Sequence, residues 1–325
     1  LDSKKNTIQI RRLDKRLQDT NNITSISDLD IKVPDNKFSD CLYSQIYHLA
    51  MGICAGESRP GDPINYMIPW LRDEAYIATA LARTGSQLAD TLIKHLARND
   101  FFGGFGAEAD APGLALWAIG EGTSFSSDDK CDSLLWKHIK RKADFIISML
   151  HAEAPVHATY LKPVLPTYKD TPEHKISVIA KPPVMGLING KMDEHYPVIY
   201  VNAISYMGLV QASSFAMRCG KTAQATEWID AANKIKHYWN NNFHIPAFEN
   251  ERNYICAIWP SGILETAKEN LYRNSILQHL DVLMSDDAYI QTPLWTYFEL
   301  AKAHQLLLLE EKKKSWDIVS WFWNN

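Results

Sequence analysis

The chain has 325 residues, of which 46% are hydrophobic and 22% are charged. This apolar content is ordinary for a globular protein and excludes a disordered or collagen-like chain. The net charge is −4 at pH 7 and the longest apolar runs are only a few residues, so we expect no nucleic acid partner and no membrane span. We expect a soluble protein, and the sequence leaves open whether it is secreted, periplasmic or cytoplasmic.

Five cysteines are scattered along the chain without a C-x-x-C pair or the spacing of zinc ligands. The odd number leaves at least one thiol outside any intrachain disulfide. We interpret the cysteines as buried, small apolar side chains. Histidine and acidic residues also lack metal-ligand spacing, and we therefore expect no metal and no organic cofactor.

The chain divides into a polar N-terminal extension, residues 1–35, and a single domain over residues 36–325. In the domain, apolar residues three and four apart predict a helix over residues 41–54. Strand signals are short and confined to connections, for example residues 254–258. The same helical periodicity and helix stop signals predict further helices over residues 74–82, 87–97, 112–120, 131–151, 198–218, 223–241, 271–284, 292–309 and 316–322.

Residues 153–197 interrupt the helical pattern with seven prolines, which prevent a long helix. We expect a long functional loop here. The helices on either side come in pairs across short turns, and no motif recurs at the fixed spacing of a solenoid. The sequence therefore predicts an all-α fold, an (α/α)6 barrel with long irregular loops on one face that build a pocket.

The first candidate cluster contains Trp70, Arg72 and Asp73, directly before a predicted helix. An arginine beside an aspartate can present a guanidinium and a carboxylate to the vicinal hydroxyls of one sugar, and Trp70 can stack on its ring. The alternative is structural: Asp73 caps the helix and Trp70 belongs to the core.

A second cluster combines glycines with Phe105, Glu108 and Asp110 before the helix that starts at Pro112. The glycines let the backbone approach a ligand closely, and the two carboxylates lie at the mouth of the helix. The alternative is a plain loop with Asp110 as the N-cap. No strand precedes the glycines and no Lys-Ser/Thr follows them, which excludes a phosphate-binding fingerprint.

The third cluster, Asp193-Glu194-His195, ends the proline-rich stretch. Neighbouring carboxylates raise each other's pKa, and a raised pKa suits a general acid. An acidic pair on the surface at a helix start is the structural alternative. Glu251 is a candidate base on weaker grounds, and Glu249 and the pair Asp286-Asp287 are its alternatives. No G-x-S-x-G motif occurs, which disfavours a serine hydrolase.

At these clusters the sequence resembles the six-hairpin glycosidases, in particular the glucoamylase-like family, with a partial likeness to neutral invertases. Trp70-Leu71-Arg72-Asp73 is similar to the family's W-x-R-D motif, whose Arg and Asp bind hydroxyls of the sugar next to the cleaved bond. The segment from Asp110 to Trp117 resembles one that carries the proton donor in invertases and lies nearer to substrate binding in glucoamylases. Asp193-Glu194 is similar to a W-E-E segment whose first acidic residue is the general acid.

The resemblance implies an exo-acting glycoside hydrolase that inverts the anomeric centre with a carboxylic acid and a carboxylate. It would release a monosaccharide from the end of an oligosaccharide or glycoside. Two alternatives stay open: a non-catalytic or regulatory barrel that binds a glycan or a protein, and a sugar isomerase or epimerase that uses His195 with a second histidine. The residues expected to provide stacking surface are Trp70, Phe105, Trp117 and Trp259; those expected to contact or cleave the sugar are Arg72, Asp73, Glu108, Asp110, Asp193, Glu194 and Glu251.

Overall fold

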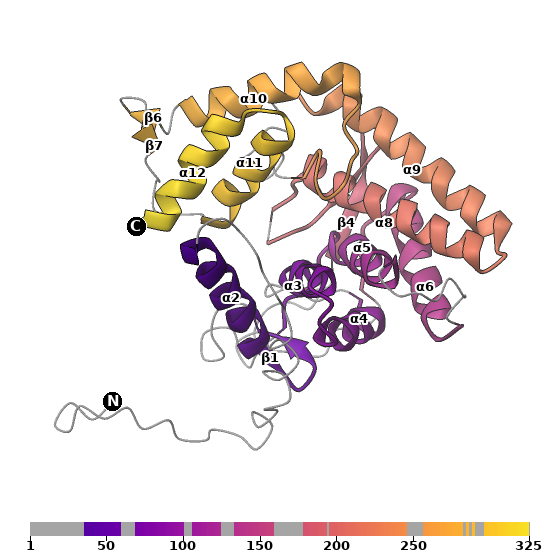
Figure 1. The fold of residues 1–325 in the computed structure, drawn as a ribbon. Helices are drawn as coiled ribbons and strands as arrows, with labels where there is room; N and C mark the ends of the chain where they lie inside the picture. Colours follow the sequence, from indigo (N-terminus) through magenta and orange to yellow (C-terminus); the bar gives the residue numbers. More distant parts are fainter. Residues whose placement is uncertain are drawn as a thin grey trace, which may run out of the picture.

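The computed structural model of the protein describes residues 36–59, 69–100, 106–124, 133–158, 178–193, 195–245, 256–281, 284–285, 288–289 and 296–324. This part of the chain is mostly helical, as the sequence predicted (Figure 1). Its α-helices are α2 (Asn36–Met51), α3 (Leu71–Arg83), α4 (Leu88–Arg98), α5 (Ala111–Ser124), α6 (Ser133–Leu150), α8 (Val198–Arg218), α9 (Thr222–Asn242), α10 (Glu269–Asp281), α11 (Thr296–Leu308) and α12 (Lys312–Asn324). The predicted extension, residues 1–35, lies outside the described residues.

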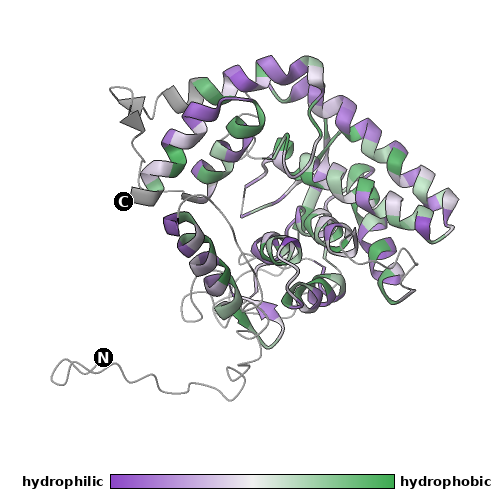
Figure 2. Ribbon diagram, viewed as in Figure 1, coloured by the Kyte–Doolittle hydropathy of each residue, from purple (hydrophilic) through white to green (hydrophobic). Residues whose placement is uncertain are grey.

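Successive helices pair as hairpins, and the pairs form two layers. Helices α3, α5 and α8 pack side by side, while α4, α6 and α9 pack against their outer side. The inner helices α5 and α8 are buried along most of their length, and every residue of α5 from Ala111 to Gly120 is buried. The outer helix α9 carries polar and apolar residues on different sides (Figure 2). This difference follows from burial, because only a helix in the outer layer has a face toward water.

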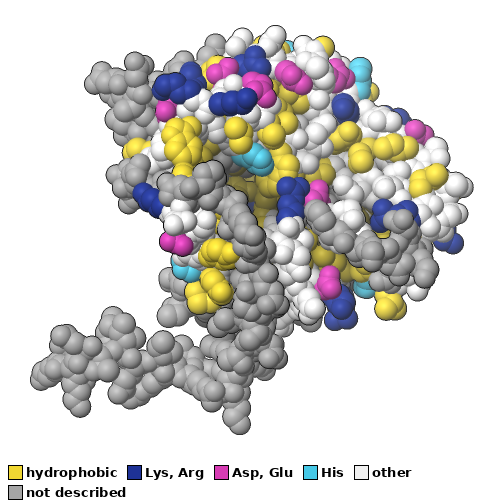
Figure 3. Space-filling view, in the orientation of Figure 1, with side chains coloured by type: hydrophobic (Ala, Val, Ile, Leu, Met, Phe, Trp, Pro, Cys, Tyr) yellow, Lys and Arg dark blue, Asp and Glu magenta, His cyan; other side chains and the backbone are white. Residues whose placement is uncertain are grey.

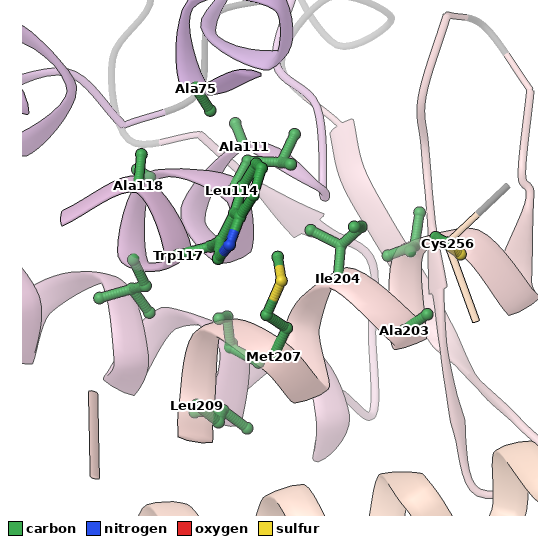
Figure 4. Close-up of a cluster of buried hydrophobic side chains, with 14 of the residues drawn as sticks. Ala75, Ala111, Leu114, Trp117, Ala118, Ala203, Ile204, Met207, Leu209 and Cys256 are labelled. Atoms are coloured by element: carbon green, nitrogen blue, oxygen red, sulfur yellow. The ribbon is translucent and has the colours of Figure 1, made fainter. Parts of the chain in front are cut away.

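The inner helices α5 and α8 approach each other closely where both lack a side chain. A Cβ built on Gly208 would lie 2.7 Å from the Cα of Gly113, so neither position has room for a larger residue. On either side of this contact, Trp117 of α5 and Met207 of α8 point toward each other within the core (Figure 4). The glycines therefore set the distance between two helices that both begin near the candidate site.

Substituting Gly208→Ala is expected to lower the free energy of unfolding by about 1–3 kcal/mol, because the added methyl group overpacks the contact with Gly113. Gly122→Ala is the comparison: its Cβ would lie 2.0 Å from Ile93 Cδ1, the end of a side chain that can move, whereas at Gly208 the obstacle is the backbone of Gly113. Urea denaturation of both variants measures the difference. Equal stability of the two would contradict this account of the close approach.

The proline-rich stretch predicted as an irregular loop contains an antiparallel sheet in strand order β3-β4-β5. The strands are β3 (Val156–His157), β4 (Val178–Val184) and β5 (Leu187–Gly190). Pro182 and Pro183 are tolerated in the central strand because the register with β5 shifts between Lys181 and Val184. The buried amide of Asn202 on α8 accepts from the Ile188 backbone N–H and donates to its carbonyl, which anchors the sheet to α8.

Helix ends differ from prediction where a turn intervenes. The predicted helix over residues 41–54 is α2, which begins at Asn36 and ends at Met51, because the chain turns at Gly52 into strand β1 (Ile53–Cys54), paired with β2 (Glu57–Ser58). Of the predicted strand at 254–258, the described residues 256–258 form turns. The prediction for α8, residues 198–218, is confirmed. The last two strands are β6 (Met284–Ser285) and β7 (Ala288–Tyr289), and a short 3₁₀ helix covers Thr266–Lys268.

The cysteines differ in state. Cys219 is disulfide-bonded, whereas Cys41, Cys54 and Cys256 are free thiols. Interpreting all of them as small apolar side chains was therefore too narrow, although it fits Cys256, which is fully buried. Among the described helices, none has the length and apolar content needed to cross a bilayer.

Candidate active site

Four described helices begin around one point, and residues far apart in the sequence meet there. Arg72 is the second residue of α3, Asp110 directly precedes α5, Asp193 lies shortly before α8, and Tyr297 is the second residue of α11. The N-terminal end of a helix carries a partial positive charge, which favours nearby carboxylates. The arrangement thus explains why acidic residues gather at this end of the helix layer.

The guanidinium of Arg72 contacts three carboxylates. Its Nε donates to Asp110 Oδ2 at 2.8 Å, its Nη2 donates to Glu108 Oε2 at 2.8 Å, and its Nη1 lies 3.1 Å from Asp193 Oδ2. The Glu108 and Asp110 side chains are 2% and 0% exposed, whereas that of Asp193 is 16% exposed. Arg72 therefore holds the carboxylates together, and most of its donors are already occupied and not available for the sugar hydroxyls that the resemblance to the glycosidase family implied.

Backbone contacts fix the relative position of the two carboxylate segments. The Asp193 backbone N–H donates to Glu108 Oε1 at 2.9 Å, and the Ala109 N–H donates to the Lys191 carbonyl at 2.8 Å. Asp193 adopts a φ of 46°, in the left-handed region that aspartate tolerates better than most residues. A residue held in such a conformation by its surroundings is common in functional sites.

Burial changes the protonation of this cluster. It raises the pKa of Glu108 to about 8, helped by the nearby charges of Asp110 and Asp193 and opposed by Arg72. Burial also raises the pKa of Asp110 and that of Asp73, again against the effect of Arg72. Burial therefore favours the protonated form of Glu108, while the N–H groups that both of its oxygens accept favour the ionised form. One carboxylate oxygen, Asp110 Oδ1, is buried and has no hydrogen-bond partner among the described residues.

An aromatic cluster adjoins the carboxylates. Tyr76 lies one turn after Arg72 on α3, and its ring centroid is 5.1 Å from that of Trp117, 5.7 Å from Trp259 and 6.0 Å from Tyr297. Trp117 is 1% exposed, so the predicted stacking surface is a core residue that supports the others. Trp259 is partly exposed. On the face shown in Figure 3, apolar side chains gather in the middle of the molecule.

The remaining predicted residues have different placements. Trp70 is the N-cap residue of α3 and is partly exposed, and its side chain makes no capping hydrogen bond. Asp73 lies in the first turn of α3 rather than at the cap. His195 is exposed, and its backbone pairs with that of Met192. Three predicted site residues lie outside the described residues: Phe105, Glu194 and Glu251.

Sequence reasoning missed three tyrosines next to the cluster, Tyr76, Tyr200 and Tyr297. Burial raises the pKa of each, and charged neighbours include Arg72 for Tyr200 and Tyr297 and Asp110 for Tyr200. The position of Tyr76, four residues after Arg72 in a helix, was a usable signal, because residues i and i+4 share a face. The other two carried no such signal.

Comparison with protein-family models, with curated proteins and with solved structures finds no match to this chain. Within the described ranges, no group of three or more histidine, cysteine or acidic residues is placed to hold a metal ion.

A second charged cluster links the first turn of α3 to α4 and to strand β2. His95 of α4 contacts Glu74 of α3 through Nδ1 at 2.5 Å and Glu57 of β2 through Nε2 at 3.5 Å. Burial disfavours the charged imidazole, but hydrogen bonds and charges from both glutamates outweigh it and raise the pKa of His95 to about 9. His95 is therefore an imidazolium at neutral pH and links the β1–β2 hairpin to α3.

We expect this linkage to depend on pH. Because the pKa of His95 rises from 6.5 to about 9 on folding, its contribution of about 3 kcal/mol is complete below pH 6.5 and is lost as pH rises through 9. Urea denaturation of wild type and His95→Gln between pH 6 and 10 should show a stability difference that shrinks toward alkaline pH. A stability difference between wild type and His95→Gln that stays constant from pH 6 to 10 would contradict the linkage. The control is His138→Gln, at a histidine whose pKa is lowered by burial. This variant should lose stability toward alkaline pH as the wild type does.

Proposed function

We propose that this chain is an exo-acting, inverting glycoside hydrolase built on an (α/α)6 barrel. The observation that supports it best is the partly exposed carboxylate of Asp193, held in a left-handed turn among carboxylates that share Arg72. Aromatic side chains adjoin this group, as a sugar ring requires of its binding site. The double layer of hairpins around α3, α5 and α8 is the basis for the barrel.

In this proposal the protonated form of Asp193 donates the proton to the leaving-group oxygen, and the carboxylate that remains takes up a proton from solvent, which reaches this partly exposed side chain. Glu108 and Asp110 are too buried to reach a substrate, and they orient Arg72 and the Asp193 turn. Asp73, on the same turn of α3 as Arg72, is available for a sugar hydroxyl.

The general base must come from another part of the chain. An inverting hydrolase separates its two carboxyl groups by roughly 6.5–9.5 Å, on opposite faces of the sugar. Glu108 and Asp110 are 2% and 0% exposed, so neither can reach the face of a sugar ring opposite Asp193. We propose Glu251 as the base. Glu194 is the alternative to Asp193 as the acid.

A second candidate function is glycan binding without hydrolysis. The ion pairs of Arg72 with Glu108, Asp110 and Asp193 favour this second function, because such a cluster can stabilise the fold without taking part in catalysis. The isomerase alternative requires His195 to face another histidine across the pocket, and no contact of this kind supports it among the described residues.

The test is release of reducing sugar from a panel of α-linked and β-linked oligosaccharides and sucrose, with NMR of the fresh product. One released monosaccharide with inverted configuration supports the proposed hydrolase. Sugar binding by calorimetry without turnover across the panel would favour the binding protein, and conversion of a free sugar into an isomer would favour the isomerase.

A further inference from the structure

The cysteines in the described part of the chain are in two states. Cys41, Cys54 and Cys256 are free thiols, whereas Cys219 is disulfide-bonded. The sequence contains five cysteines, and a disulfide within one chain uses two of them. Cys131, which lies outside the described residues, is therefore the cysteine that remains as the partner of Cys219.

Cys219 lies at an end of the helix layers where four helices meet. It directly follows the last residue of α8, and α9 begins three residues later. Arg218 at the end of α8 donates to the hydroxyl of Thr123 near the end of α5 at 3.3 Å. The ring centroid of Trp136, in the first turn of α6, lies 5.8 Å from that of Trp228 in the second turn of α9. The ends of α5 and α8 and the starts of α6 and α9 therefore share one end of the layers.

The position of Cys131 in the sequence fits this end of the layers. It precedes Ser133, the first residue of α6, by two residues. Two residues of chain span at most about 7 Å, and the Cα atoms of a disulfide lie roughly 4.4–6.8 Å apart. Because α6 begins where α8 ends, a link this short is sufficient to pair Cys131 with Cys219.

We propose that Cys131 and Cys219 form a disulfide that joins the α5–α6 connection to the α8–α9 connection. This inference does not depend on the proposed hydrolase function. In the step that forms the bond, the two thiols lose two protons and two electrons and the S–S bond forms. The protons and electrons reduce the disulfide of a thiol–disulfide oxidoreductase to two thiols. Such carriers act in oxidising compartments, whereas the cytosol keeps thiols reduced, so the chain folds in an oxidising compartment.

The bond closes a loop of roughly 90 residues, and a cross-link restricts the unfolded chain more as the loop grows. This loop contains α6, the β3-β4-β5 sheet, Asp193 and α8. The disulfide lies at the C-terminal end of α8, whereas Asp193 lies shortly before its N-terminal end. It therefore stabilises the segment that carries Asp193 without adjoining the carboxylates. Cys256 does not compete for the bond, because it is fully buried and burial raises the pKa of its thiol.

Peptide mapping of the full chain, produced by export into an oxidising compartment, tests the pairing. Free thiols are blocked with N-ethylmaleimide in denaturant before digestion. Trypsin cuts after lysine and arginine, so it isolates Cys131 in residues 131–137 and Cys219 in residues 219–221. We expect mass spectrometry to find these two peptides linked and to find them separate after reduction. A blocked thiol in either peptide, or a link from either to a copy of itself or to another cysteine, would overturn the proposal.

Thermal unfolding measures what the bond contributes. Cys131→Ser and Cys219→Ser should each lower Tm by roughly 5–10 °C, and the double variant should lose no more than either one. Cys41→Ser, at a free thiol of similar partial burial, is the matched control and should stay within about 2 °C of wild type. A wild-type Tm for Cys131→Ser, or a double variant that loses the sum of both, would contradict the bond. If the serine variants do not fold, the peptide map of the wild type decides.

Production of the same chain in a reducing cytosol tests the compartment. There we expect Cys219 to be recovered as a blocked thiol, with the Tm of the Cys219→Ser variant. Exposure of that material to oxidised glutathione should restore the linked peptides and the higher Tm. A chain that is fully linked when purified from a reducing cytosol would overturn the requirement for an oxidising compartment.

Discussion

Replacing Arg72 by methionine is expected to lower the free energy of unfolding by about 3–5 kcal/mol, because it leaves three carboxylates without their shared cation in a buried site. The loss should be smaller at pH 5 than at pH 8, since burial raises the pKa of Glu108 to about 8 and a protonated carboxyl needs no cation. Urea denaturation at the two pH values measures both effects.

Arg83 of the same helix provides the control for this substitution. It pairs with Glu121 at 3.0 Å, but its side chain is 48% exposed, so Arg83→Met should cost no more than about 1 kcal/mol. A cost for Arg72→Met as small as that for Arg83→Met would mean that the carboxylate cluster is held by other contacts. Comparing the two variants shows how much of the loss in stability comes from the burial of the ion pair, because both arginines lie on α3 and only Arg72 is buried.

The second large effect is expected at Asp193. Under the proposed hydrolase function, Asp193→Asn should reduce kcat by about 10²–10⁴-fold on an oligosaccharide that the wild type cleaves, because the amide cannot donate a proton. Stability should change little: asparagine also tolerates the φ of 46°, and this side chain is the most exposed of the three around Arg72. Initial rates and urea denaturation of the purified variant test both statements.

A substrate series sharpens the result for Asp193. A nitrophenyl leaving group departs without protonation, so Asp193→Asn should lose much less activity on a nitrophenyl glycoside than on an oligosaccharide. Asp90→Asn, at an exposed aspartate of α4, should behave as wild type. If Asp193→Asn keeps full activity on oligosaccharides, the proton donor is a different residue, and Glu194 becomes the next one to substitute.

The local sequence pattern was sufficient to predict the helices, because helix formation depends on residues only three and four positions apart. Periodicity and stop signals located α8 to the residue and most other described helices within a few residues. The same method failed for residues 153–197, where prolines argued against any regular structure. Strand β4 accommodates Pro182 and Pro183 where its register with β5 shifts. A register is a property of two paired strands, so the local pattern of one segment does not reveal it.

For the candidate site, the sequence identified many of the residues but not how they are arranged in space. Arg72, Glu108, Asp110 and Asp193 were all named as candidates from local composition, and the structure brings them together around one guanidinium. The donors of Arg72 contact these carboxylates, and the role in sugar binding that the resemblance implied stays a prediction. Tyr200 could not be found in advance, since it is one polar residue in an otherwise apolar buried helix.

The sequence by itself determined the helical class, the absence of any long apolar segment and the short motifs that carry the acidic and aromatic residues. Only the tertiary structure decided which carboxylate reaches solvent, in which ones burial raises the pKa and which tryptophan is core. The physical reason is that exposure and pKa depend on neighbours more than 30 residues away in the chain, as between Arg72 and Asp110, whereas helix formation depends on residues three and four apart.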